Sequence, residues 1–179
     1  MNWILFALAG SVAQLVDGTL GMGFGLTSST LLLTLGASAA VASAAVHAAE
    51  IGTTLVSGVS HWHAENVDRK ILLKLAIPGG IGALLGATFL SSIDISSAKI
   101  FISTLLLLLG FLLLYRNIFQ TSTPRPSLEI SNPRYLTYLG FTGGFVDAAG
   151  GGGWGPIVTP TMMTTTQIEP RKIIGTVSA

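Results

Sequence analysis

Long uncharged stretches separated by polar connections dominate the pattern of this sequence. A membrane-spanning helix needs about 20 mostly apolar residues, and three stretches have that length: residues 39–60, 71–92 and 98–115. Between and after them lie polar connections at residues 63–70, 91–97 and 116–134. The leucine runs do not alternate with polar residues as the strands of a membrane β-barrel do. The pattern predicts an all-α, polytopic membrane protein.

Two further apolar segments, residues 3–36 and 135–166, are too long to be simple spans. A continuous helix over residues 3–36 would measure about 51 Å, although the hydrocarbon layer is only about 30 Å thick. Each segment is interrupted by glycines, at Gly21, Gly23 and Gly25 and then between Gly150 and Gly155. Each is therefore predicted either as one unwound span or as a re-entrant hairpin of two half-helices.

The positive charges favour the hairpin interpretation. If both broken segments cross the membrane once, the nine cations divide into six and three; if both return, they divide into eight and one, with Lys99 alone on the outer side. Positive residues in short loops accumulate in the cytoplasm, which favours the second division. We expect an outer N-terminus, a first repeat over residues 1–116, a cytoplasmic linker at 117–134 and the start of a second repeat at 135–179.

The two broken segments resemble each other when one is shifted by 130 residues. The shift aligns Phe24 with Trp154 and superimposes identical residues at Gly10 and Gly140, Val16 and Val146, Asp17 and Asp147, Gly21 and Gly151, Gly23 and Gly153, Gly25 and Gly155, and Thr34 and Thr164. A hairpin followed by three spans crosses the membrane an odd number of times, so a second copy would be inverted, as in many secondary transporters. Two complete copies would need roughly 260 residues, so we expect the second half to be incomplete.

Composition excludes several other classes of protein. Charged residues make up 9% of the chain, whereas soluble domains have about 25%, and the mean hydropathy is +0.69. Zero cysteines exclude thiol chemistry and disulfide scaffolds. A net charge of +1 without a basic run gives no electrostatic basis for binding nucleic acid. No nucleophile motif with a plausible base is present, so we expect neither an enzyme nor a cofactor.

Four titratable residues, Asp17, His47, Glu50 and Asp147, are expected at membrane depth. Such residues usually face a polar interior or one another. His47 and Glu50 are three residues apart and share a helix face, so the pair could carry protons or could be a static pair that holds helices together. The aspartates could instead accept hydrogen bonds from backbone amides at the glycine turns.

The glycine clusters are the basis for the predicted substrate site. A helix interrupted in lipid frees backbone N–H groups, which are tolerated only when buried in protein or lining a cavity, and the N-termini of the half-helices near Phe24 and Trp154 would attract an anion. The substrate-binding residues are predicted to be Gly21, Gly23, Gly25, Ser28, Ser29, Gly151, Gly153, Gly155 and Thr159. Close helix packing through small residues is the alternative interpretation. No metal site is expected, since His61 lies about 21 Å along the helix from His47.

Three long motifs connect these residues with a known family: AQLVDGTLGMGFGLTSSTLLL, ASAAVHAAEIGTTLVSGVSHWHAENVD and GFVDAAGGGGWGPIVTPTMM. They resemble the sulfite exporter TauE/SafE family, also called the toluene-sulfonate uptake permease family. The resemblance implies a bacterial cytoplasmic-membrane protein with two related halves that moves sulfite or organosulfonate anions, usually outward. Family members have a complete second half, so we expect this chain to be truncated. A passive anion channel and a non-transporting membrane scaffold remain as alternatives, and the flank that missing helices would leave could be covered in a homo-oligomer.

Overall fold

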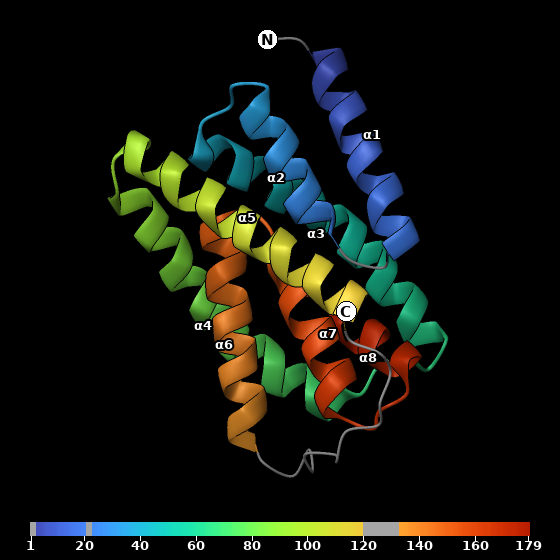
Figure 1. The fold of residues 1–179 in the computed structure, drawn as a ribbon. Helices are drawn as coiled ribbons and strands as arrows, with labels where there is room; N and C mark the ends of the chain where they lie inside the picture. Colours follow the sequence, from blue (N-terminus) through green and yellow to red (C-terminus); the bar gives the residue numbers. More distant parts are fainter. Residues whose placement is uncertain (1–2, 21–22, 120–132) are drawn as a thin grey trace.

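The structure is a computed structural model in which residues 3–20, 23–119 and 133–179 are described. Within these ranges the regular elements are α-helices, in agreement with the predicted all-α class (Figure 1). In chain order they are α1 (Trp3–Leu20), α2 (Phe24–Thr34), α3 (Ala39–His63), α4 (Arg69–Ser92), α5 (Ile95–Phe119), α6 (Pro133–Gly150), α7 (Trp154–Thr165) and α8 (Pro170–Val177).

Three of the helices correspond to the three predicted spans. Helices α3 and α4 are long and apolar enough to cross a membrane, by length and composition. Polar residues of the predicted connections cap the helix starts: the carboxylate of Asp68 accepts from the amides of Lys70 and Ile71, and that of Asp94 accepts from the amide of Ser97. Helix α5 continues to Phe119, past the predicted span end at residue 115. Residues 120–132 of the predicted linker lie outside the described residues, and its last two residues, 133 and 134, are the first of α6.

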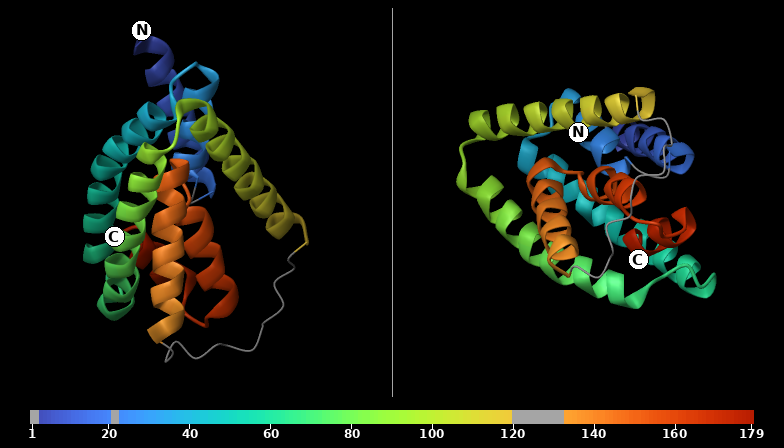
Figure 2. Two further views of the ribbon diagram at one scale, coloured as in Figure 1. Left: turned by 90° about the vertical axis from the view of Figure 1, so that its left-hand side faces the viewer. Right: turned by 60° about the horizontal axis from the view of Figure 1, so that its bottom comes forward.

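Both broken segments form hairpins of two helices. Helix α1 runs inward from the end of the molecule where the chain starts, and α2 returns to that end; α6 and α7 do the same from the opposite end (Figures 1 and 2). The predicted half-helix starts are confirmed, since α2 begins at Phe24 and α7 at Trp154. Gly25 and Gly155 were expected within the interruptions, but they lie in the first turns of α2 and α7. The structure thus has two hairpins of inverted orientation.

The positive residues follow this arrangement. Lys99 lies near the start of α5, at the end where α1 begins and α2 finishes (Figure 2). The opposite end holds, among the described side chains, Arg69, Lys70, Lys74, Arg134, Arg171 and Lys172. The asymmetry that favoured the hairpin prediction is therefore present in the fold.

Helices α4 and α6 form the most extensive helix pair and join the two halves. A Cβ at Gly82 would overlap the carbonyl oxygen of Phe141, and one at Gly144 would overlap the carbonyl oxygen of Gly79. The backbones are therefore close enough that only glycine fits, which is the packing expected of small residues between membrane helices.

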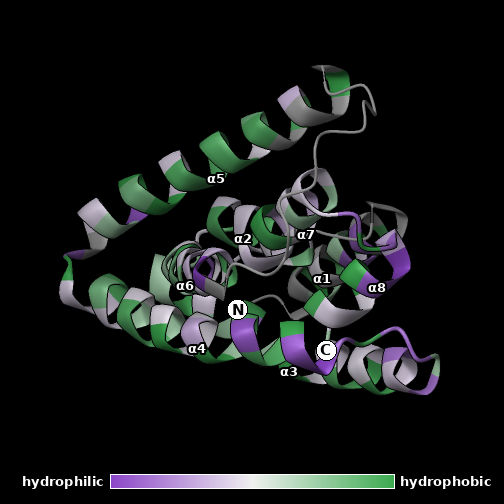
Figure 3. Cartoon of the chain, turned by 90° about the horizontal axis from the view of Figure 1, so that it is seen from below, coloured by the Kyte–Doolittle hydropathy of each residue, from purple (hydrophilic) through white to green (hydrophobic). Residues whose placement is uncertain are grey.

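Large apolar side chains face outward on the long helices. Ile51 and Leu55 of α3, Leu84 of α4 and Leu107 of α5 are among the most exposed of them. Figure 3 shows α5 as hydrophobic along most of its length, whereas α8 carries strongly hydrophilic positions. Surfaces of this kind are stable against lipid rather than water.

The α4–α6 interface predicts opposite effects for two neighbouring glycines. Gly82→Ala places a methyl group on the backbone of Phe141 and should destabilise the protein by about 1–3 kcal/mol. Gly80 has open space at its Cβ position, so Gly80→Ala should be neutral or stabilise by up to about 1 kcal/mol. Midpoints of thermal unfolding in detergent measure both. Equal midpoints for the two variants would contradict the close approach of α4 and α6.

The topology can be tested with single cysteines, because the chain has none of its own. Ser38 lies between α2 and α3, and Ala64 lies just after α3 at the opposite end. With an outer N-terminus, a membrane-impermeant thiol reagent added to intact cells should label Ser38→Cys and leave Ala64→Cys unlabelled until the cells are opened. Labelling of Ala64→Cys alone in intact cells would reverse the orientation.

Candidate functional site

The two helix breaks meet inside the protein and pack directly against each other. A Cβ at Gly25 would lie 2.5 Å from the Cα of Gly152, so neither position has room for a larger residue. Gly152 also has a φ of +147°, a conformation that residues with a side chain rarely adopt. The hydroxyl of Ser43 in α3 donates to the carbonyl oxygen of Ala148 at 3.2 Å. The first half therefore supports the broken backbone of the second half.

The two aspartates occupy equivalent places in the two breaks. Asp17 Oδ1 accepts from the backbone amide of Phe24 at 3.1 Å. Asp147 Oδ1 accepts from the amides of Gly153 at 2.6 Å and Trp154 at 2.9 Å. The shift of 130 residues that aligned the sequences thus also superimposes a contact between an aspartate and the first residue of the following helix. The interpretation of both aspartates as acceptors for freed amides is confirmed.

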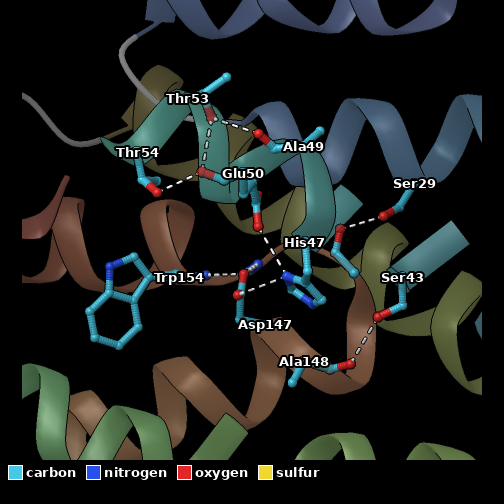
Figure 4. Close-up of polar contacts among 12 residues, drawn as sticks. Ser29, Ser43, His47, Ala49, Glu50, Thr53, Thr54, Asp147, Ala148 and Trp154 are labelled. Atoms are coloured by element: carbon cyan, nitrogen blue, oxygen red, sulfur yellow. Dashed lines mark hydrogen bonds and ion pairs between the residues drawn. The ribbon is translucent and has the colours of Figure 1, made fainter. Parts of the chain in front are cut away.

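His47, Glu50 and Asp147 form one cluster where α3 passes the second break (Figure 4). His47 Nδ1 lies 3.0 Å from Glu50 Oε2 and 3.8 Å from Asp147 Oδ2. His47 Nε2 is buried, and it has no hydrogen-bond partner within the described part of the chain. The expected contact between His47 and Glu50 is present, and Asp147 adds a residue of the second half to the cluster.

A cavity of about 540 Å³ opens beside this cluster. Most of the predicted site residues line it: Asp17, Gly23, Gly25, His47, Glu50, Asp147, Gly153, Gly155 and Thr159. Its wall comes from both breaks and from the face of α3 between them. The predicted site is thus largely assembled in one place.

Three further predicted residues, Ser28, Ser29 and Gly151, lie outside the cavity wall. Ser29 is buried and its hydroxyl donates to the carbonyl oxygen of Gly151, which stabilises the junction of the breaks. Ser28 is buried, and its hydroxyl has no partner among the described residues. Gly21 lies outside the described residues.

Several polar residues of the wall were not predicted. They are Gln14, Thr53, Thr54, Ser57 and Ser178. The three on α3 lie three, four and seven residues after Glu50, which places them on the same helix face. This spacing could have identified the three residues from the sequence. No sequence pattern indicates Ser178, because its position depends on how α8 packs.

The helix starts leave backbone donors at the cavity. The first three N–H groups of a helix have no acceptor within it, and those of Phe24 and Trp154 are bonded to the aspartates. The amides of Gly25 and Gly155, which belong to two residues of the cavity wall, remain for other acceptors, because the first intrahelical bonds of α2 and α7 are made by Thr27 and Ile157.

The histidines at the end of α3 take no part in the cluster. His61 Nδ1 lies 3.4 Å from the side-chain amide of Asn66, and His63 Nδ1 lies 2.8 Å from the carbonyl oxygen of Val59. The ligand atoms of His47, Glu50 and Asp147 lie within 4.8 Å of one another. That spacing is close enough for the three groups to share a proton or a single cation.

Removal of the Asp147 carboxylate tests its contact with the break. Asp147→Ala leaves the amides of Gly153 and Trp154 unpaired, at about 1–3 kcal/mol for each buried donor. Asp147→Asn keeps an oxygen acceptor at the same place and should lose much less. Thermal unfolding midpoints in detergent give the comparison. Equal losses for the two variants would show that the bonds to Oδ1 do not stabilise the break.

Comparison with known proteins agrees with this architecture. Residues 6–179 match the family described as sulfite exporter TauE/SafE. The chain is 49% identical over 178 residues to a protein of Bacillus subtilis (strain 168) named "Probable membrane transporter protein YtnM". That match covers 97% of this chain and 58% of the relative. No solved structure is significantly similar to the chain. The match over almost the whole length shows that the chain is a membrane protein of the sulfite exporter TauE/SafE family.

Proposed function

We propose that the protein is a membrane transporter that moves a small sulfur-containing anion, sulfite or an organosulfonate, out of the cytoplasm. The name of the family and that of the Bacillus relative support transport. The observation that carries the proposal is the cavity at the junction of the two breaks, whose wall includes carboxylates and hydroxyl groups. The two broken segments enter from opposite ends (Figure 2). Secondary transporters commonly bind their substrates at such a junction of inverted repeats.

The cavity suits a small polar solute. Its volume of about 540 Å³ lies within the 300–1,000 Å³ that is usual for small-molecule sites, to an order of magnitude. The amides of Gly25 and Gly155 are donors at the positive ends of α2 and α7. Thr159 on α7 adds a hydroxyl to the same wall. Sulfite and sulfonate oxygens are acceptors that such donors would bind.

The charges of the cavity indicate how an anion could enter. Among its described lining residues are three carboxylates, Asp17, Glu50 and Asp147, and no lysine or arginine. Two like charges 4 Å apart repel by about 4 kcal/mol at an effective dielectric constant of 20. An anion would therefore bind favourably only when this negative charge is reduced by protons.

His47 and Glu50 are the residues we propose for this proton coupling. Asp17 and Asp147 hold backbone amides through one oxygen each, so their charged forms stabilise the breaks. Glu50 contacts His47 through Oε2, and histidine titrates near neutral pH. A proton taken up by this pair would remove a negative charge or add a positive one beside the amide donors.

Flux of radiolabelled sulfite or of an organosulfonate in proteoliposomes tests the proposal. We expect flux that depends on the pH and falls by about tenfold or more in Glu50→Gln, because the neutral amide can neither take up nor release a proton. Glu65→Gln is the matched control, since Glu65 is exposed and lies beyond α3, outside the cavity.

Two results would contradict parts of the proposal. Flux that is unchanged in both Glu50→Gln and His47→Ala would remove the coupling role, and independence from the pH would favour a passive channel. Absence of specific flux for both classes of substrate would overturn the assignment of a sulfur-containing anion.

A further inference from the structure

We propose that the outer face of α1, formed by Gly10, Ser11, Gln14 and Leu15, is the docking surface for a further membrane-spanning helix. This partner helix carries small residues on one face, as α4 does, and belongs to the part of a longer relative that has no counterpart in this chain. The proposal is independent of the transported solute, because it follows from how the two repeats pack.

Helices α1 and α6 occupy equivalent positions in the two repeats. The two helices align with a shift of 130 residues, and each has, three residues before its end, an aspartate that accepts from the first amide of the helix after the break. Ala13 and its counterpart Gly143 are both buried. The repeats are thus equivalent in contacts as well as in sequence.

Another face of α6 packs closely against α4. Gly140 and Gly144 lie against the backbone of Leu75 and Gly79, and the backbones of Phe141 and Phe145 lie against Gly82 and Gly86. The face of α6 that is covered by α4 therefore consists of residues 140, 141, 144 and 145.

The equivalent face of α1 is not covered by another helix among the described residues. Its residues are Gly10, Ser11, Gln14 and Leu15. No described atom lies within 4 Å of a Cβ at Gly10, whereas a Cβ at Gly140 would overlap the backbone of Leu75. Ser11 and Gln14 are exposed, and 71% of Leu15 is accessible. The face of α1 that corresponds to the α4-contacting face of α6 is therefore available to a further helix.

A protein helix fits this face better than lipid does. Gln14 lies both on the face and in the cavity wall. Its amide can bond to another helix, whereas acyl chains offer no partner. A second copy of the chain cannot supply its own α4, because the glycine face of that helix is already covered by α6. The Bacillus relative is longer, since the match covers 58% of it.

Cross-linking in the membrane tests the proposal. The probe is the portion of the Bacillus relative that the match leaves uncovered, co-expressed with this chain and carrying single cysteines along its apolar segments. Ser11→Cys should form disulfides with it under mild oxidation. Val12→Cys is the matched control, because Val12 is also exposed and its counterpart Thr142 remains exposed in α6.

Copurification of the two pieces gives a second measurement. Gly10→Leu places a large side chain on the proposed face, where a Cβ has no described atom within 4 Å, and should lower copurification by about tenfold or more. Gly80→Leu, at an open glycine of α4, should leave it unchanged.

The proposal is overturned if the unmodified pieces do not copurify, if Gly10→Leu has no effect, or if positions 11 and 12 cross-link equally. Disulfides between two copies of Ser11→Cys in the absence of the probe would replace the partner helix with a homodimer and also overturn it.

Discussion

A backbone interrupted inside a membrane exposes peptide groups that lipid cannot bond, and this constraint organises the centre of the protein. Each break is stabilised by a carboxylate at the end of the preceding helix: Asp17 accepts from Phe24, and Asp147 accepts from Gly153 and Trp154. An aspartate at this place is therefore a structural requirement of the break. The same carboxylates then fix the charge of the cavity beside them.

The two breaks also depend on each other. Gly25 and Gly152 are in backbone contact, and the packing of α4 against α6 brings the second hairpin to the first half. Because glycine-to-glycine contacts fit in one register only, a small shift of either hairpin would separate both breaks. The two halves nevertheless differ at the cavity: at a shift of 131 residues, which aligns Val46 with Val177, the position of His47 is taken by Ser178.

Much of this arrangement could be predicted from the sequence, because membrane helices leave strong local signals. The spans at α3, α4 and α5, the helix starts at Phe24 and Trp154, and the shared helix face of His47 and Glu50 all follow from length, glycine position or spacing. The choice of hairpins over unwound spans needed only the distribution of cations.

What could not be predicted depends on packing between distant segments. Ser28 and Ser29 look like hydroxyl donors one turn into α2, but the side chain of Ser29 is used by the carbonyl of Gly151 in the other half. The contact of Asp147 with His47 joins residues that are 100 positions apart in sequence, and no periodic pattern encodes it. Gln14 and Ser178 enter the cavity wall for the same kind of reason.

A conflict between stability and anion binding follows from the roles of the carboxylates. Charge on Asp17 and Asp147 strengthens their bonds to the amides of the breaks, yet the same charge repels an anion in the cavity. Their protonation would relieve the repulsion and weaken the breaks. A titratable pair that holds no backbone amide among the described residues avoids this conflict, and His47 with Glu50 is placed in that way on the rigid helix α3. Separate groups can thus hold the structure and change charge, so the cavity can accept a negative solute while its broken helices keep their partners.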